Sequence, residues 1–291
     1  MKRFFATIII CLMLCGCAPA PVPAKIAATT LPVWEFTSRL CDGTGISVTR
    51  LVTESVSCLH DYTLQVGQMR AIESAEMIVI SGAGLEEFLE DALHGAAVTV
   101  DASAGIELFC PEEDPGHDHS DHEHHHDNDP HIWLSPVNAA VMVRNICDGL
   151  IARYPQFEAQ FLQNRSVLIA ELEALDQYGN TQLENLSQRE IITFHDGFAY
   201  LADHYNLHIL RAVEEESGSE ASAAELIELI ELVNSHQLRA IFTEVSGADS
   251  AARIIQAETG VRLLQLDMAM SGGSYFDAMY RNIDVLKEAL E

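Results

Sequence analysis

The chain has 291 residues, of which 48% are hydrophobic, and its 44 Asp and Glu against 16 Lys and Arg give a formal net charge of -28. Such an excess of acidic groups excludes nucleic acid and acidic lipid as natural partners, because both carry the same sign of charge. Divalent cations, in contrast, would be concentrated around this surface.

The N-terminal residues predict an export signal. Lys2 and Arg3 precede an apolar run over 4–14, which is too short for a permanent membrane span but fits the hydrophobic region of a signal peptide. The run ends in Leu-Cys-Gly-Cys, which resembles a bacterial lipobox, so we expect 1–16 to be removed and Cys17 to carry the lipid. Residues 17–25 then form a proline-containing tether. The expected location is outside the cytoplasm, membrane-anchored at the cell surface or in the periplasm; an uncleaved anchor is the less favoured alternative.

Beyond the tether, short β-branched runs alternate with amphipathic helical stretches, which is typical of an α/β fold with parallel sheets. Helices are expected over 86–94, 223–236, 248–259 and 275–291. We predict two lobes, 26–154 and 187–291, each with a roughly four-stranded parallel sheet flanked by helices. The expected strands are 26–30, 46–52, 77–82, 96–100, 190–194, 208–213, 239–245 and 261–266.

Residues 155–186 are expected to join the lobes. Their apolar positions recur at spacings of three, four and seven, which predicts one long linker helix. A break into two helices near Gly179 is an alternative, because an interior glycine costs a helix only about 1 kcal/mol. The recurring positions are Phe157, Phe161, Leu168, Leu172 and Leu175.

The segment 111–129 is acidic and rich in histidine, and 117–126 reads HDHSDHEHHH. It has no periodic apolar pattern, so we expect a mobile loop within the first lobe. Its composition is typical of segments that collect divalent transition metals weakly, although a solvated loop of low complexity would look the same. The histidines are His117, His119, His122, His124, His125 and His126.

The sequence does not support an enzymatic function. HEHHH at 122–126 matches the zinc-protease pattern H-E-x-x-H, but that pattern requires an ordered helix that presents both histidines on one face. Neither a G-x-S-x-G elbow nor a phosphate-binding loop occurs in the sequence. We therefore expect no catalytic residues and no ATPase activity in this chain.

Four side chains outside the histidine-rich segment are candidate metal ligands. His60 follows one predicted strand, His195 and Asp267 end two others, and His131 lies in DPHIWLSP. Ligands in α/β folds lie beyond the carboxyl ends of parallel strands, and two candidates come from each half of the chain. Three imidazoles and one carboxylate would complete a tetrahedral zinc shell that leaves no position for a reacting water. Glu244, at the end of FTEV, is the main rival to Asp267.

Two further groups of side chains leave alternatives open. Asp196 would either cap a helix over 197–205 or accept a hydrogen bond from a metal ligand, and we favour the cap. Cys41, Cys58, Cys110 and Cys147 are even in number, so disulfides outside the cytoplasm are allowed, but their spacing fits neither a zinc ribbon nor a redox motif.

Several motifs, in this order, resemble the metal-binding lipoproteins that serve zinc and manganese ABC importers. The resemblance covers essentially the whole mature chain. It implies two α/β lobes bridged by a rigid helix, metal between them, and delivery to a membrane permease driven by a cytoplasmic ATPase. It also implies that His60, His131, His195 and Asp267 are the ligands, and we expect the chain to act as a monomer. The motifs are CLHDYTL, DPHIWLSP, TFHDGFAYLADHY, EEESGSEASAAEL, FTEVSGAD and LDMAMSGGSYFDAMYRNIDVLKEAL.

Zinc is the expected metal. In the family that this chain resembles, zinc binders carry a histidine at the FHD position, as this chain does, whereas manganese members carry a glutamate there. Imidazole also suits zinc, while manganese prefers oxygen-rich shells. A manganese or broad divalent-metal binding protein, or a metal-containing surface adhesin, stays an alternative. Leu59 and Ala221 depart from the prolines common in relatives, which puts local loop shape in doubt but not the ligands.

Overall fold

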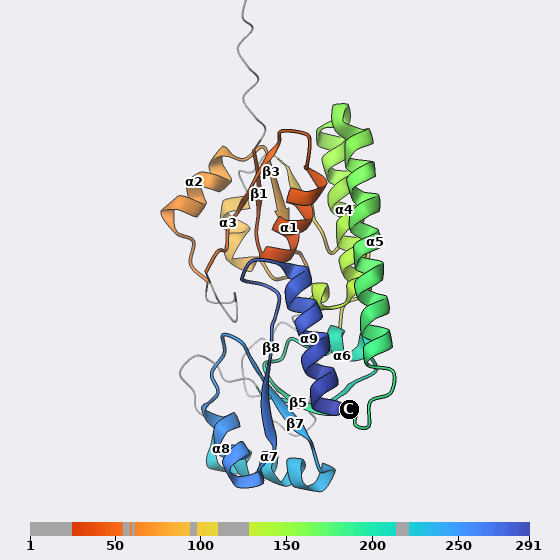
Figure 1. Ribbon diagram of the computed structural model, residues 1–291. Helices are drawn as coiled ribbons and strands as arrows, with labels where there is room; N and C mark the ends of the chain where they lie inside the picture. Colours follow the sequence, from red (N-terminus) through yellow and green to blue (C-terminus); the bar gives the residue numbers. More distant parts are fainter. Residues whose placement is uncertain (1–24, 55–58, 60–61, 94–97, 110–127, 214–220) are drawn as a thin grey trace, which may run out of the picture.

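The computed structural model describes residues 25–54, 59, 62–93, 98–109, 128–213 and 221–291. They form two lobes, each built on a four-stranded sheet (Figure 1). The strand orders are β2-β1-β3-β4 and β6-β5-β7-β8, and all the pairings are parallel. The predicted fold class is thereby confirmed. The strands are β1 (Lys25–Ala28), β2 (Ser47–Arg50), β3 (Met77–Ile80), β4 (Thr99–Asp101), β5 (Glu190–Phe194), β6 (His208–Ala212), β7 (Ala240–Glu244) and β8 (Arg262–Leu266).

The central strands are buried on both faces. All of β7 is buried, as are the last four residues of β5 and the last three of β1. Parallel strands covered by helices on both faces have continuous hydrophobic runs, which explains why these segments do not alternate between apolar and polar residues. The outer strands β2 and β8 keep partly exposed side chains.

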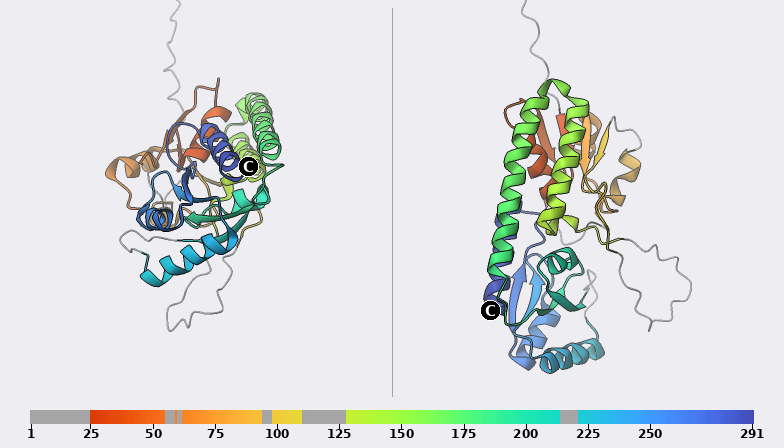
Figure 2. Two further views of the ribbon diagram at one scale, coloured as in Figure 1. Left: turned by 60° about the horizontal axis from the view of Figure 1, so that its bottom comes forward. Right: turned by 90° about the vertical axis from the view of Figure 1, so that its right-hand side faces the viewer.

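Short helices surround each sheet (Figures 1 and 2). The helix expected over 86–94 is only partly correct, because Glu87–Leu89 form a 3-10 turn before the single turn of α3. The helices of the first lobe are α1 (Leu31–Leu40), α2 (Val66–Ser74) and α3 (Glu90–Leu93), and those of the second are α6 (Ala199–His204), α7 (Ala223–His236) and α8 (Ser250–Thr259).

Two long antiparallel helices, α4 (Pro136–Arg153) and α5 (Glu158–Gln182), pack side by side along one flank of the molecule (Figure 2). Helix α5 is the long helix expected between the lobes, although 155–157 form a 3-10 turn before it. It continues through Gly179, so the alternative of two helices is wrong. A Cβ at Gly179 would lie 2.3 Å from the hydroxyl oxygen of Tyr205, so the glycine allows close packing rather than a break.

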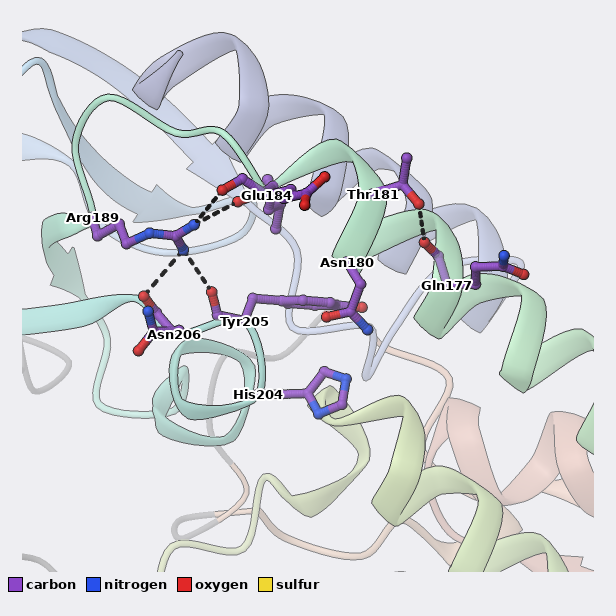
Figure 3. A pocket seen from close by; sticks show the side chains of 9 residues that line it. Gln177, Asn180, Thr181, Glu184, Arg189, His204, Tyr205 and Asn206 are labelled. Atoms are coloured by element: carbon purple, nitrogen blue, oxygen red, sulfur yellow. Dashed lines mark hydrogen bonds between the residues drawn. The ribbon is translucent and has the colours of Figure 1, made fainter.

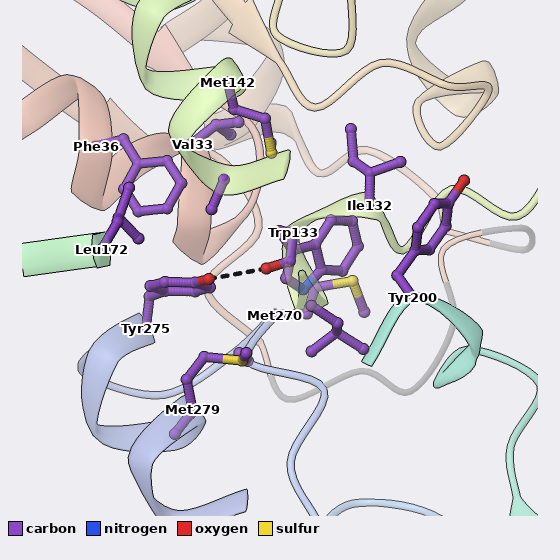
Figure 4. Close-up of a cluster of buried hydrophobic side chains, with 14 of the residues drawn as sticks. Val33, Phe36, Ile132, Trp133, Met142, Leu172, Tyr200, Met270, Tyr275 and Met279 are labelled. Carbon is purple, nitrogen blue, oxygen red and sulfur yellow. Dashed lines mark hydrogen bonds between the residues drawn. The ribbon is translucent and has the colours of Figure 1, made fainter. Parts of the chain in front are cut away.

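Helix α9 (Tyr275–Leu290) runs from the first lobe to the second and packs against α1, α5 and β8 (Figure 1). One large hydrophobic core contains residues of both lobes, including Phe36, Trp133 and Tyr275. Figure 4 shows these side chains, with the Tyr275 hydroxyl donating a hydrogen bond of 2.8 Å to the Trp133 carbonyl. The lobes are therefore joined by packed side chains as well as by the chain.

Several sequence predictions lie outside the described residues: the signal peptide, the tether with Cys17, His60 and the histidine tract over 117–126. Only the last residue of the expected tether, Lys25, is described, and it begins β1. Within the described ranges, no helix combines the length and the hydropathy needed to cross a bilayer. Cys41 and Cys147 are buried free thiols, whereas Cys58 and Cys110 are not described.

Candidate metal site

His131 is fixed by the buried residues that follow it. Ile132, Trp133 and Leu134 form a 3-10 turn with no exposed surface. The Trp133 indole N–H donates a 2.7 Å hydrogen bond to the carbonyl of Met268, in the segment after β8. This anchoring leaves the His131 side chain near the junction of the lobes, with 8% of the residue exposed.

His195 follows the last residue of β5 directly and is 9% exposed. Its ring centroid lies 5.3 Å from that of His131, with the ring planes at 84°. Two imidazoles from different lobes are thus brought together with little access to water. Two nitrogen donors at this separation are suited to a transition metal with imidazole ligands.

Gly197 allows this close approach. A Cβ there would lie 2.6 Å from Met268 Cε, 2.7 Å from His195 Cδ2 and 3.0 Å from His131 Cε1. Any larger residue would have to displace at least one imidazole. The glycine of the FHDG sequence is therefore part of the geometry of the site.

Asp129 orients His131. One carboxylate oxygen, Oδ1, accepts a 2.9 Å hydrogen bond from the His131 backbone N–H and lies 2.8 Å from the ring Nδ1. A carboxylate at Nδ1 holds the ring proton there and leaves Nε2 as the coordinating nitrogen, which is the usual arrangement behind a metal-bound histidine. Sequence reasoning missed this role, although the DPH sequence contains the signal.

The base of the histidine-rich segment lies beside His131. Asp129 N–H donates to the Phe109 carbonyl at 2.8 Å. The Tyr200 hydroxyl accepts from Phe109 N–H and donates to the Asp129 carbonyl, both at 3.0 Å. The residues on either side of 110–127 are therefore tied together next to one candidate ligand.

Asp267 follows β8 and is held mainly by α9. Asn282, which is 1% exposed, accepts from Asp267 N–H at 2.8 Å and donates to the Asp267 carbonyl at 2.7 Å. The carboxylate Oδ1 accepts from Ala269 N–H at 2.8 Å, and Oδ2 lies 3.2 Å from Nη1 of Arg281. The carboxylate is therefore paired with a cation of the same chain.

Glu244, the rival carboxylate, lies behind His195. It is 4% exposed, and its Oε2 is 3.8 Å from His195 Nδ1. Burial, and then the charge of Asp267, raise the pKa of Glu244 to about 7. Its position on the Nδ1 side of the ring suits the orientation of His195 better than the binding of a metal at Nε2.

Arg189 helps to place β5. Its guanidinium donates to the carbonyls of Leu183 and Glu184, at the end of α5, and of Tyr205 and Asn206, after α6 (Figure 3). These residues line a polar pocket of about 480 Å³ that includes none of the candidate ligands. The arginine is engaged with backbone groups, so its role is to fix the turn that leads into β5 and His195.

The described residues thus bring His131 and His195 together, with Asp129 and Glu244 behind them. Within those residues, no group of three or more His, Cys, Asp or Glu side chains is arranged to hold a metal, and His60 lies outside them. The prediction that Asp196 caps a helix is wrong, because α6 begins at Ala199 with Phe198 at its N-cap, and Asp196 is exposed.

Known proteins resemble this chain over most of its length. Zinc-binding lipoprotein AdcA of Streptococcus pneumoniae is 31% identical over 281 residues, which are 92% of this chain but only 56% of the relative. The high-affinity zinc uptake system protein ZnuA of Bacillus subtilis is 31% identical over 91% of this chain and 87% of its own length. The crystal structure of the Zn(II)-bound ZnuA-like domain of S. pneumoniae AdcA superimposes with a TM-score of 0.77 at 28% identity, covering 92% of this chain and 99% of that domain.

The family model described as zinc-uptake complex component A, periplasmic, matches residues 26–289. That range contains the long helices α4 and α5, all four candidate ligands and both sheets apart from Lys25, the first residue of β1. The chain spans about half the length of the AdcA relative, and nearly all of the ZnuA relative. It belongs to the family of periplasmic zinc-uptake component A proteins.

Proposed function

We propose that this chain captures Zn²⁺ between its two lobes and delivers it to the permease of an ABC importer, whose ATPase is a separate chain. The observation that carries the proposal is the pair of nearly buried imidazoles, His131 and His195, whose ring centroids are 5.3 Å apart. Zinc relatives of similar length and fold support the choice of metal.

In this proposal His60 and Asp267 complete the shell. Three imidazoles and one carboxylate satisfy tetrahedral zinc at about 2.0 to 2.2 Å per ligand. A closed shell has no position for a water nucleophile, so the site binds metal and performs no reaction. Manganese is not favoured, since an imidazole-rich shell suits it poorly, and no structural observation favours the adhesin alternative.

The N-terminal signal and the histidine tract have supporting roles in this proposal. Lipid on Cys17 and a tether over 17–25 would hold the folded lobes outside the cytoplasm, at the membrane that contains the permease. The tract over 117–126 would collect metal weakly beside His131, because the residues that flank it are tied together there. Incorporation of a labelled fatty acid should be lost in the Cys17→Ser variant.

The main test is zinc affinity measured by competition with a chelator on metal-stripped protein. Wild type should bind one zinc tightly, and His195→Ala should weaken that site by about a thousandfold or more, because one of only four ligands is lost. His236→Ala is the matched control, since His236 lies in the same lobe, is partly exposed and pairs with Glu190. Equal affinities for wild type and His195→Ala would refute the site.

Two further measurements separate the parts of the proposal. Deletion of 117–126 should leave the tight site and remove weaker ones; loss of the tight site would mean that the tract supplies a ligand. Uptake of radiolabelled zinc should fall in cells that lack this chain, whereas an adhesin would leave uptake intact.

A further inference from the structure

Arg281 lies beside the only candidate ligand that carries a negative charge. It extends from α9, and its Nη1 is 3.2 Å from Oδ2 of Asp267. The Arg281 side chain is 59% exposed, whereas that of Asp267 is 18% exposed. A largely exposed cation therefore pairs with a largely buried carboxylate.

The backbone of Asp267 does not depend on this contact. Asn282 holds both the N–H and the carbonyl of Asp267 through its buried amide. Ala269 N–H occupies the other carboxylate oxygen, Oδ1. Among the described contacts of the Asp267 carboxylate, the one with Arg281 can therefore break without disturbing the backbone of the segment after β8.

We infer that Arg281 is a counter-cation within the chain. It competes with the incoming metal for the Asp267 carboxylate and pairs with that carboxylate again when the metal leaves. The inference rests on the proposed function, because it requires Asp267 to be a zinc ligand. A guanidinium at hydrogen-bond distance withdraws charge from the ligand oxygen and repels a nearby dication. Arg281 therefore weakens zinc binding and speeds release, which suits a protein that must deliver its metal.

The expected effect is modest, because pairs of this exposure are screened by solvent. Replacement by Arg281→Gln should tighten zinc binding by about three- to fivefold and slow release into excess chelator by a similar factor. The difference from wild type should shrink as salt is raised, because the pair lies partly in water. Arg281→Lys, which retains the charge, should keep most of the wild-type affinity.

Arg253→Gln provides the matched control. Arg253 is an exposed arginine on α8 of the same lobe, paired at 2.6 Å with Asp249, the N-cap residue of that helix. Its replacement removes the same charge from the chain without touching Asp267, so zinc affinity should stay within about twofold of wild type. Equal gains in the two variants would overturn the inference, since net charge alone would then explain the effect.

A second experiment, in a protein that already carries Asp267→Asn, tests whether the gain in zinc affinity depends on the Asp267 carboxylate. In an Asp267→Asn protein the Arg281→Gln change should no longer tighten binding, because the oxygen for which the two cations compete has lost its charge. Unchanged or weaker binding in Arg281→Gln, with wild type tight and His195→Ala weak, would overturn the inference and leave the proposed function standing. Absence of tight zinc binding in wild type would instead reject the proposed function.

Discussion

In each lobe, a set of polar residues lies at or beyond the carboxyl ends of the strands, but the contacts of these sets differ between the lobes. In the first lobe Thr29 follows β1, Glu86 comes from the connection after β3, and Asp101 ends β4. In the second lobe the corresponding residues are His195 after β5, Glu244 at the end of β7 and Asp267 after β8. Both sheets have the same strand order, so Thr29 and His195 follow equivalent strands, and Asp101 and Asp267 lie at the ends of equivalent strands. Glu86 comes from the connection after β3, whereas Glu244 is the last residue of the equivalent strand β7.

The described hydrogen bonds of the first set stay within the first lobe. The Thr29 hydroxyl donates to Glu86 Oε1 at 2.6 Å, and the N–H groups of Ser81 and Gly82 donate to the same carboxylate. Asp101 accepts from Ser103 N–H, just as Asp267 accepts from Ala269 N–H, both at 2.8 Å. Every partner of Glu86 is therefore structural.

The second set includes a side chain that contacts the other lobe. Where the first lobe has a hydroxyl, the second has the imidazole of His195, which reaches His131. Its carboxylate, Glu244, approaches that ring only to 3.8 Å. The same sheet end thus supports packing when it carries threonine, and a candidate metal site when it carries histidine.

The largest expected effect comes from making the second lobe like the first. His195→Thr should weaken zinc binding by about a thousandfold or more, because it removes one of four ligands. The midpoint of thermal unfolding without metal should stay close to that of wild type, because threonine is the residue that the first lobe carries directly after the equivalent strand. Chelator competition and calorimetry measure the two effects, and retained zinc affinity would remove the basis of the comparison.

The buried carboxylate of the first lobe predicts a pH dependence of stability. Burial raises the pKa of Glu86 from 4.5 to about 7. Between these values the native state holds a proton that the unfolded chain has released, so the free energy of unfolding falls as pH rises. This contribution should decrease by about 2–3 kcal/mol between pH 5 and pH 8.

Glu86→Gln removes that titration, although its amide cannot accept all three hydrogen bonds. The unfolding free energy of wild type minus that of the variant, from urea titrations, should therefore be larger at pH 5 than at pH 8. Glu87→Gln, at an exposed neighbouring position, controls for the change in net charge. A difference that is constant or grows with pH would contradict the expected direction.

Orientation of His131 by Asp129 should have a smaller effect than loss of a ligand. Asp129→Asn should weaken zinc binding by about 10- to 100-fold, because the amide holds the Nδ1 proton less strongly than the carboxylate does. Asp148→Asn, at an exposed side chain on α4, is the control. An affinity unchanged by Asp129→Asn would show that the ring needs no carboxylate behind it.

The smallest expected effect is in the first lobe. Thr29→Val should lower the free energy of unfolding by about 0.5–1.5 kcal/mol, because Glu86 loses one of its three hydrogen-bond donors and keeps the two backbone ones. Zinc affinity should change little, since Thr29 contacts no candidate ligand in the described contacts. A large loss of zinc affinity would show that the two sheet ends are coupled rather than separate in function.

Much of the fold could be predicted because short β-branched runs and helix periodicity are local signals. All the expected strands form, and α5 follows the spacing that contains Phe161, Leu168 and Leu175. Helix α4 was not expected, although Ser135 and Pro136 are a start signal at its N-cap and first residue. The helix over 86–94 is shorter than expected because Glu86 is drawn into the buried network with Thr29.

The candidate site could be predicted only in part. Strand ends identified His195 and Asp267, because the carboxyl ends of parallel strands are where ligands gather. The partners were not predictable, since the contact between Arg281 and Asp267 depends on how α9 packs beside β8. Likewise, nothing in a single glycine of FHDG indicates that two imidazoles pass within 3.0 Å of its Cβ position.

The segment after Asp267 has a mechanical consequence. Arg50, at the end of β2, donates to the carbonyls of Met270 and Gly272, and Leu31 N–H donates to Met270 as well. These bonds tie the segment that follows Asp267 to the first lobe. Separating the two lobes would therefore strain this short connection and expose the shared core to water, at about 25 cal/mol per Å² of apolar surface. For the proposed zinc site, small shifts of the side chains around the candidate ligands are therefore a less costly route for metal exchange than wide separation of the two lobes.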